Sequence, residues 1–268
     1  MLPKRDWLEM TWEDFAHGQP SRWIAVLPIA AVEQHGPHLP LGVDSFIAHA
    51  YLVRARELLS PELPATFLPV QAIGYSNEHT AFAGTLSVSA ETLLRTLGEI
   101  GVSVHRAGVR KLLIVNSHGG NAEVMSIIAR DLRVRLGLLA VTTSWHQLGY
   151  PERLFPEDEQ LHGIHAGEIE TSIMLASRPE LVATGRAQNF ASAAQNMEKE
   201  FKRLHLLQPA GFGWMTQDIN PSGAAGNASA ATAAKGQAAL DHGARAFVAL
   251  LQEVDRFDLS RLADGPLG

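Results

Sequence analysis

The sequence predicts an α/β fold: a three-layer α/β/α sandwich around a mainly parallel sheet. Short runs of continuously apolar residues, typical of strands buried on both faces, alternate with segments of helical period. Hydrophobic residues make up 46% of the chain and charged residues 19%, which is ordinary for a globular protein. The length of 268 residues is enough to bury a large core and allows one large domain or two small ones.

The first part of the chain reads as a strand, a helix and a second strand. Residues 23–29 (WIAVLPI) form a short apolar run of the buried-strand type. A polar loop follows at residues 33–44, and then a helical segment from about 45 to 59. Residues 66–70 are the next strand candidate. This order is typical of a parallel sheet.

Two amphipathic helices are indicated by apolar residues that recur every three or four positions. The first follows Ser89, a good N-cap, and its apolar face has spacings of 4, 3 and 4, at Leu93, Leu97, Ile100 and Val104. The C-terminal helix, preceded by a helix-forming alanine-rich stretch at 228–239, has spacings of 4, 3, 4 and 3, at Leu240, Ala244, Phe247, Leu251 and Val254.

The clearest buried strand is at residues 111–116 (KLLIVN). It leads through a glycine turn into a helix at 121–136, which precedes a further strand at 138–143 and a short helix at 168–176. Two segments, 151–164 and 187–225, are poorly periodic and rich in Gly, Pro, Asn and Gln. We interpret these two as long active-site or interface loops rather than linkers.

The composition excludes several classes of site. The chain has no cysteine, so disulfides, cysteine-based zinc sites, iron–sulfur clusters and thiol nucleophiles are excluded, and any transition metal must be held by His, Asp and Glu. The net charge of −6, with no Lys/Arg run, argues against a nucleic-acid or membrane partner. Residues 1–10 are polar, without the apolar core of a signal peptide. We expect a cytoplasmic protein.

The first candidate site is a twelve-residue loop that carries Glu33, His35, His38 and Asp44. Carboxylate oxygens and imidazole nitrogens together are the ligands that a divalent transition metal prefers. The loop follows a predicted strand, and in parallel sheets the loops at the carboxyl ends of the strands form the site. The alternative is a polar surface loop with unrelated charges.

A second candidate is the segment Asn116-Ser117-His118-Gly119-Gly120-Asn121. His118 lies at a strand end, before a helix N-terminus, and the two glycines let backbone N–H groups approach a ligand closely. A plain glycine turn with Asn121 as N-cap is the alternative reading.

The third candidate contains His165, Glu168, Glu170 and Ser172. His165 and Glu168 are three residues apart and could share a helix face if the helix begins early. An ordinary acidic first turn, in which glutamates complement the helix dipole, is the alternative.

At these clusters the sequence resembles the creatininase (creatinine amidohydrolase) family. The matching pieces are EQHGPHLPL with Asp44, NSHGGN from Asn116, and HAGEIETS from His165, together with residues 74–79 and 82–87 and the C-terminal region from Gly223 to Gly236. They occur in the family's order over nearly the whole chain. The resemblance therefore implies a single creatininase-like domain, residues 1–268, with the α/β/α fold.

The same resemblance implies a metal-dependent amidohydrolase with two divalent ions, a metal-bridging hydroxide, cleavage of a non-peptide C–N bond in a small-molecule substrate (a cyclic amide, lactam or formamide), and a homohexamer. Zinc is the first choice of ion, with manganese or iron as alternatives. Carried over by position, Glu33, Asp44 and His118 hold one metal, and His35 with the bridging Asp44 holds the other.

This chain departs from creatininase itself at Gly120, where creatininase has a metal-binding glutamate. We infer that Glu168 supplies the missing ligand. The departure also separates the chain from creatinine as substrate and places it nearer the branch that includes formamide deformylases and the peptidase of mycofactocin maturation.

The expected chemistry assigns roles to the remaining residues. His165 would carry the proton from water to the leaving nitrogen, and Glu170 would orient His165 or pack structurally. The Gly119 and Gly120 amides are candidate oxyanion donors, and Trp145 would line the substrate pocket or belong to the core. Two further hypotheses are a peptide-processing hydrolase of the mycofactocin-maturation type and a non-catalytic metal-binding relative.

Overall fold

The computed structural model describes residues 2–207, 209–263 and 265. Its central sheet has four strands, all parallel, in the order β2-β1-β3-β4. The strands are β1 (Ile24–Ile29), β2 (Ala65–Phe67), β3 (Lys111–Asn116) and β4 (Leu139–Ser144). Ile29 pairs with Asn116, and Asn116 pairs with Ser144, so β1, β3 and β4 end level with one another. The loops after these three strands therefore leave the sheet at one edge, the carboxyl edge.

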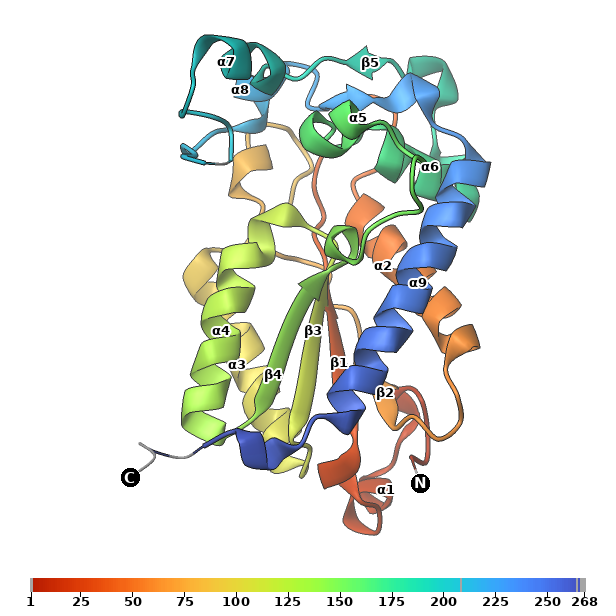
Figure 1. Ribbon diagram of the computed structural model, residues 1–268, viewed down its shortest axis with the longest axis vertical. Coiled ribbons are helices and arrows are strands. Elements are labelled where there is room, and N and C mark those ends of the chain that lie inside the picture. The colour runs from red at the N-terminus through yellow and green to blue at the C-terminus, as the bar shows by residue number, and fades with distance from the viewer. Residues whose placement is uncertain (1, 208, 264, 266–268) are drawn as a thin grey trace.

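Helices cover both faces of the sheet, which confirms the predicted three-layer architecture (Figure 1). One face is covered by α3 (Ala90–Arg106) and α4 (Ala122–Leu136), and the other by α2 (Val43–Leu58), α6 (Glu168–Ser177) and α9 (Ala233–Arg256). The smaller elements are α1 (Trp12–Ala16), α5 (Glu157–His162), α7 (Ala194–Glu200), α8 (Thr216–Ile219), and the antiparallel pair β5 (Asn189–Phe190) and β6 (Gly226–Asn227). Figure 1 shows α5, α7, α8 and β5 gathered beyond the carboxyl edge, with α1 at the opposite end.

The core divides into two hydrophobic clusters, one on each face. In β3, Leu112 and Ile114 pack with α3 and α4, whereas Leu113 and Val115 pack with α2 and α9. A strand buried on both faces loses the polar alternation of a half-exposed strand, which explains why KLLIVN is a continuous apolar run.

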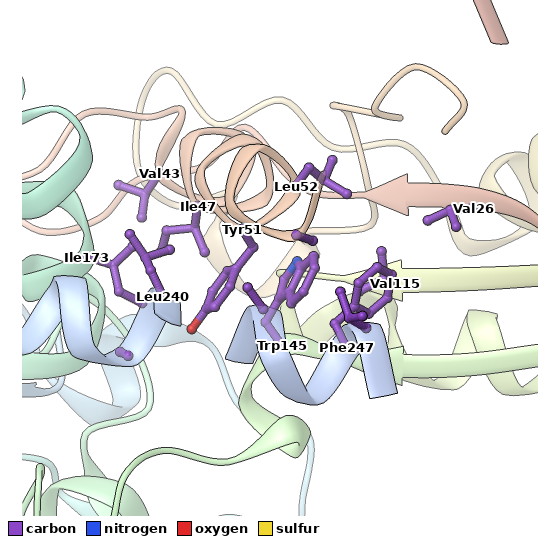
Figure 2. Close-up of a cluster of buried hydrophobic side chains, with 14 of the residues drawn as sticks. Val26, Val43, Ile47, Tyr51, Leu52, Val115, Trp145, Ile173, Leu240 and Phe247 are labelled. Carbon is purple, nitrogen blue, oxygen red and sulfur yellow. The ribbon is translucent and has the colours of Figure 1, made fainter. Parts of the chain in front are cut away.

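On the α2/α9 face, aromatic rings stack behind the carboxyl edge (Figure 2). Tyr51 and Trp145 are stacked with ring centroids 4.4 Å apart, and Phe247 packs against Trp145 at 4.8 Å. Each of the three side chains is almost fully buried. Trp145 follows β4 directly, so this stack fixes where that loop leaves the sheet.

The predicted elements agree with the structure to within a few residues, except that β2 is shorter than the predicted strand. Ser89 is the expected N-cap and accepts a hydrogen bond from the Thr92 N–H. The two segments predicted as long loops also contain short elements, namely α5 in the first and β5, α7 and α8 in the second. These elements are too short to show a period. Among the described residues, no helix is both long and apolar enough to cross a bilayer.

Candidate metal centre

A pocket with a volume of about 1050 Å³ opens at the carboxyl edge. Its floor is formed by the loops after β3 and β4 and by the segment before α6, which supply His118, Trp145 and His165. The far wall comes from α5 and from residues 206–207 and 211–215. The second and third polar clusters of the sequence therefore line one cavity. The first cluster does not line it but lies against the other two, because the buried Glu33 faces His118 and His165.

Glu33 lies at the centre of the polar cluster and is almost fully buried. Three imidazoles face its Oε1 atom: His118 Nδ1 at 3.1 Å, His79 Nε2 at 3.4 Å and His165 Nδ1 at 3.7 Å. The Ser76 hydroxyl donates to Oε2 at 2.5 Å. Burial alone would raise the pKa of Glu33, but the attraction of His118 and its neighbours outweighs burial and holds that pKa below its usual range.

His118 joins this carboxylate to the backbone of the segment before it. Its Nε2 atom faces the Tyr75 carbonyl at 2.9 Å and donates there, which leaves Nδ1 facing Glu33. Burial opposes a charge on the ring, but Glu33 stabilises the charge more strongly and raises the pKa of His118 to about 10. A buried carboxylate and an imidazole nitrogen that face each other in this way could both bind one metal ion.

A second group of donors lies beside the first. His35 Nε2 and Asp44 Oδ2 are 3.8 Å apart, buried, and without a hydrogen-bond partner. Glu170 Oε2 is also 3.8 Å from His35 Nε2. Because His35 Nδ1 donates to the Glu33 carbonyl at 3.0 Å, Nε2 carries the free lone pair. Ligand atoms around a tetrahedral zinc ion are separated by about 3.4 Å, so this spacing fits a divalent ion.

The protonation tendencies of this group point the same way. Burial and then Glu33 raise the pKa of Asp44 well above its ordinary value, and burial likewise raises that of Glu170. Burial and the neighbouring His165 hold the pKa of His35 well below its ordinary value. Two acids with raised pKa values, one buried and one half-buried, and a neutral imidazole are a group that a cation would stabilise.

Donor atoms within 4.8 Å of one another form three sets among the described residues: Glu33, His79 and His165; His35, His165 and Glu170; and Glu33, His35 and Asp44. The structure thus brings together six of the predicted site residues: Glu33, His35, Asp44, His118, His165 and Glu170. His38, from the same loop, instead bonds Thr171 Oγ1 through Nε2 at 2.9 Å and stacks on Phe190.

Glu168 is not part of this cluster. Its carboxylate forms an ion pair with Lys235, and its backbone N–H donates to Glu159 Oε1 at 2.6 Å. Helix α6 begins at Glu168, with Gly167 as N-cap, so His165 lies before the helix and shares no helix face with Glu168. Side chains two positions apart on a helix are about 200° apart around its axis. Glu168 and Glu170 therefore point in nearly opposite directions, and Glu170 is the one that faces the cluster.

The loop before α6 is held against the segment before β6. His165 and Ala225 exchange both backbone hydrogen bonds, at 3.2 and 2.7 Å. The His165 Nε2 atom donates to the Gln34 carbonyl at 2.7 Å, which turns Nδ1 toward Glu33. Ala166 has a positive φ of 54°, and its N–H donates to Glu170 Oε2 at 2.6 Å. Glu170 therefore stabilises the turn that carries His165.

The predicted substrate-binding residues all line the pocket. A Cβ atom at Gly119 would meet nothing within 4 Å, whereas one at Gly120 would lie 2.6 Å from Glu78 Oε1. Trp145 lines the pocket only as the edge of the aromatic stack and is 3% exposed, so it is mainly a core residue. Asn121 does not cap α4 with its side chain, because its amide bonds Tyr75 N–H, the Ala30 carbonyl and Asn116 Oδ1.

Sequence reasoning missed four polar residues of the centre: Gln34, Ser76, Glu78 and His79. Gln34 Nε2 lies 2.8 Å from His79 Nδ1 and donates to the Gly223 carbonyl at 2.7 Å, and Glu78 Oε1 is 3.5 Å from His118 Nε2. The available signal was the run Ser76-Asn77-Glu78-His79 in an irregular segment, where an acid beside a histidine is a candidate for the site.

Comparisons with known proteins agree with this arrangement. The family model described as "Creatininase: Creatinine amidohydrolase" matches residues 8–251. A mycofactocin precursor peptide peptidase of Mycobacterium ulcerans (strain Agy99) is 34% identical over 224 residues, which cover 81% of this chain and 80% of the relative. A creatinine amidohydrolase of Pseudomonas putida is 30% identical over 195 residues, covering 66% of this chain and 74% of the relative.

The fold is also that of solved structures. A Bacteroides fragilis NCTC 9343 protein described as a creatinine amidohydrolase superposes with a TM-score of 0.79 at 25% identity, covering 96% of this chain and 99% of that one. A manganese form of creatininase and a Zn-Zn form of a mutant creatininase have TM-scores of 0.72 and 0.69 at 25% and 26% identity, each covering 93% of this chain and 98% of that one. The sequence match over most of the chain, the shared fold and the convergent His/Glu/Asp cluster together place this chain in the creatininase family of hydrolases.

Proposed function

We propose that this chain hydrolyses an amide C–N bond with two divalent ions at the candidate metal centre. The proposal rests on two buried potential ligand atoms that have no hydrogen-bond partner, His35 Nε2 and Asp44 Oδ2. They lie directly beside Glu33 and Glu170. Buried polar atoms without partners are costly and uncommon in folded proteins. A bound cation would remove that cost at both atoms.

The ligands divide into two sets that share one carboxylate. We propose that Glu33, Asp44 and His118 hold one ion, and that His35, Asp44 and Glu170 hold the other. Glu170 thus takes the role that the sequence assigned to Glu168. The ions would lower the pKa of water and polarise the substrate carbonyl.

The proton is moved by His165 in this scheme. Its Nδ1 faces the cluster while its Nε2 is occupied by the Gln34 carbonyl. Nδ1 can therefore accept a proton from water and return it to the leaving nitrogen. Glu170 and the turn at Ala166 fix the position of the ring. The amide of Gly119, a pocket-lining residue at which an added Cβ would meet nothing within 4 Å, is the candidate donor to the developing oxyanion.

The size of the pocket favours a peptide amide. Ordinary small-molecule sites have volumes of roughly 300–1000 Å³, and this pocket, at about 1050 Å³, lies at the upper end. The similarity to the Mycobacterium ulcerans peptidase supports the same substrate class. A non-peptide C–N bond, as in a cyclic amide, lactam or formamide, is the second candidate, supported by the similarity to a creatinine amidohydrolase.

Zinc is the first choice of ion and manganese or iron the alternative, because all-nitrogen/oxygen ligation admits each of them. The homohexamer and the cytoplasmic location implied by the sequence stay predictions.

The proposal is tested by assaying the protein loaded with zinc or manganese against blocked dipeptides, lactams, cyclic ureides and formamides. We expect cleavage of the blocked dipeptides, measured by mass spectrometry of the products. Cleavage of only the non-peptide amides would favour the second candidate. A protein that binds two ions but cleaves no member of any class would be a non-catalytic metal-binding relative, and the proposal would be wrong.

A further inference from the structure

The far wall of the pocket carries large apolar side chains. Five of them form what we call the apolar wall: Leu161, Leu206, Leu207, Phe212 and Trp214. Leu161 is 62% exposed, Leu207 55% and Phe212 39%. Exposed apolar area that gathers in a cavity, rather than being scattered, indicates a binding surface.

The apolar wall is anchored to the metal centre. Leu206 and Trp214 pack with Ile164, Ile219 and Ala225 in a small hydrophobic cluster of their own. Ala225 is the residue that exchanges backbone hydrogen bonds with His165.

A second link joins the wall to the segment that carries His79. Thr216, just after the wall, donates its hydroxyl to the Glu78 carbonyl at 2.9 Å. The wall and the proposed catalytic groups therefore face one cavity in a fixed relation.

The charges around the pocket are one-sided. Glu78, Glu123 and Glu170 line the pocket, whereas no lysine or arginine is among the described residues that line it. Phosphate and carboxylate groups are ordinarily bound by arginine or lysine. A substrate anion placed on the wall would find no such cation beside the five apolar side chains.

From these observations we propose that the apolar wall is a specificity subsite for an uncharged aliphatic or aromatic side chain next to the scissile amide. The inference rests on the proposed amide hydrolysis and narrows its substrate class. It disfavours a phosphorylated or acidic side chain at this position of the substrate. The occupant is a side chain of the substrate itself, because the wall lines the same cavity as His118, His165 and Glu170 of the metal centre.

The test compares two series of blocked dipeptide amides, N-acetyl-X-Gly-amide and N-acetyl-Gly-X-amide, in which X is Gly, Leu, Phe, Asp or Lys. In at least one series, the metal-loaded enzyme should cleave the Leu and Phe peptides with a kcat/KM about 10-fold or more above that of the Asp and Lys peptides. One well-packed apolar group is worth roughly 10- to 200-fold in discrimination.

The same segment of chain offers matched control variants. Phe212 lines the pocket and Phe201 does not, although each is 39% exposed. Leu207 and Leu204, 55% and 43% exposed, form a second such pair. Phe212→Ala and Leu207→Ala should each reduce the Phe-over-Asp preference several-fold. Phe201→Ala and Leu204→Ala should leave the preference intact.

A binding measurement separates failure of the subsite from failure of the proposed function. Isothermal titration of the metal-loaded protein should show tighter binding of N-acetyl-phenylalaninamide than of N-acetyl-aspartamide, and Phe212→Ala should abolish the difference. That binding preference without any peptide cleavage would retain the subsite and reject peptide hydrolysis. Equal binding of both probes, or equal cleavage of the Asp and Phe peptides, would overturn the subsite.

Discussion

At the scale of single residues, His165 differs from His118 and His79 in its distance from Glu33. Its Nε2 is held by a backbone carbonyl and its Nδ1 faces Glu33 at 3.7 Å, a longer separation than that of His118 or His79. This geometry suits a proton carrier better than a ligand.

Replacing His165 by asparagine should therefore separate chemistry from metal binding. We expect His165→Asn to retain both ions and to reduce kcat by about 10²- to 10⁴-fold, the ordinary contribution of general acid–base catalysis. Turnover with metal analysis of the same sample measures both effects. Loss of an ion in proportion to the lost activity would make His165 a ligand and contradict the assignment.

Gly120 shows how far one position can be understood from sequence. The resemblance indicated that a ligand of creatininase is missing there, and it led us to Glu168 because relatives with the same His-Gly-Gly-Asn segment carry a Glu or His at that position. In the structure, the space next to Gly120 is filled by the Glu78 carboxylate among others, and the second carboxylate beside His35 belongs to Glu170. Whether Glu168 or Glu170 faces the cluster depends on the residue at which α6 begins, and the sequence does not specify that residue.

At the scale of elements, α5 holds the loop before α6, which carries His165, in place through Glu159. This buried carboxylate accepts hydrogen bonds from the Glu168 N–H at 2.6 Å and the Asn227 N–H at 2.8 Å, joining the start of α6 to β6. A Cβ atom at Gly163, Gly167 or Gly226 would clash with it, so all three positions require glycine. No sequence pattern indicates this arrangement, because α5 is too short to have a period.

Glu159→Gln should disturb the metal centre from outside it. The amide cannot accept both hydrogen bonds, and an unsatisfied buried N–H costs about 1–3 kcal/mol. We expect a lower Tm, and, because His165 and Glu170 flank the displaced turn, a fall in kcat larger than the rise in KM together with a shifted pH profile. Glu157→Gln, an exposed change in the first turn of the same helix, is the control. Unchanged kcat and pH profile in Glu159→Gln would leave it a stabilising residue without influence on the site.

At the scale of the whole molecule, the sequence predicts those helices and strands whose apolar residues recur at a regular spacing. The sheet and its main helices bury long, regular faces, so their periods appear in the sequence. The segment at 187–225 folds by contacts with α5, with the loop before α6 and with residues 78–79. Such contacts between distant parts of the chain leave no local pattern, and the pocket wall was therefore predicted only as a loop.

The burial of so many acids and imidazoles together makes the metal-free protein sensitive to pH. Because the folded-state pKa of His118 is raised to about 10, its charge stabilises the fold fully below the ordinary pKa of about 6.5. That stability is lost as the pH rises toward 10. We expect the Tm of the metal-free protein to fall between pH 6.5 and 9.5. His118→Gln should show a smaller slope, and a slope equal to that of the wild type would contradict the role of this pair.

The central claim is that two divalent ions are held by these donors, with Glu170 rather than Glu168 completing the second set. The most direct test is inductively coupled plasma mass spectrometry of the zinc-loaded wild type, Glu170→Gln and Glu168→Gln, each checked for an unchanged circular dichroism spectrum. The account predicts about two ions per chain in the wild type and in Glu168→Gln, and about one in Glu170→Gln. Loss of an ion from Glu168→Gln with both retained in Glu170→Gln, or a wild type that binds none, would contradict it.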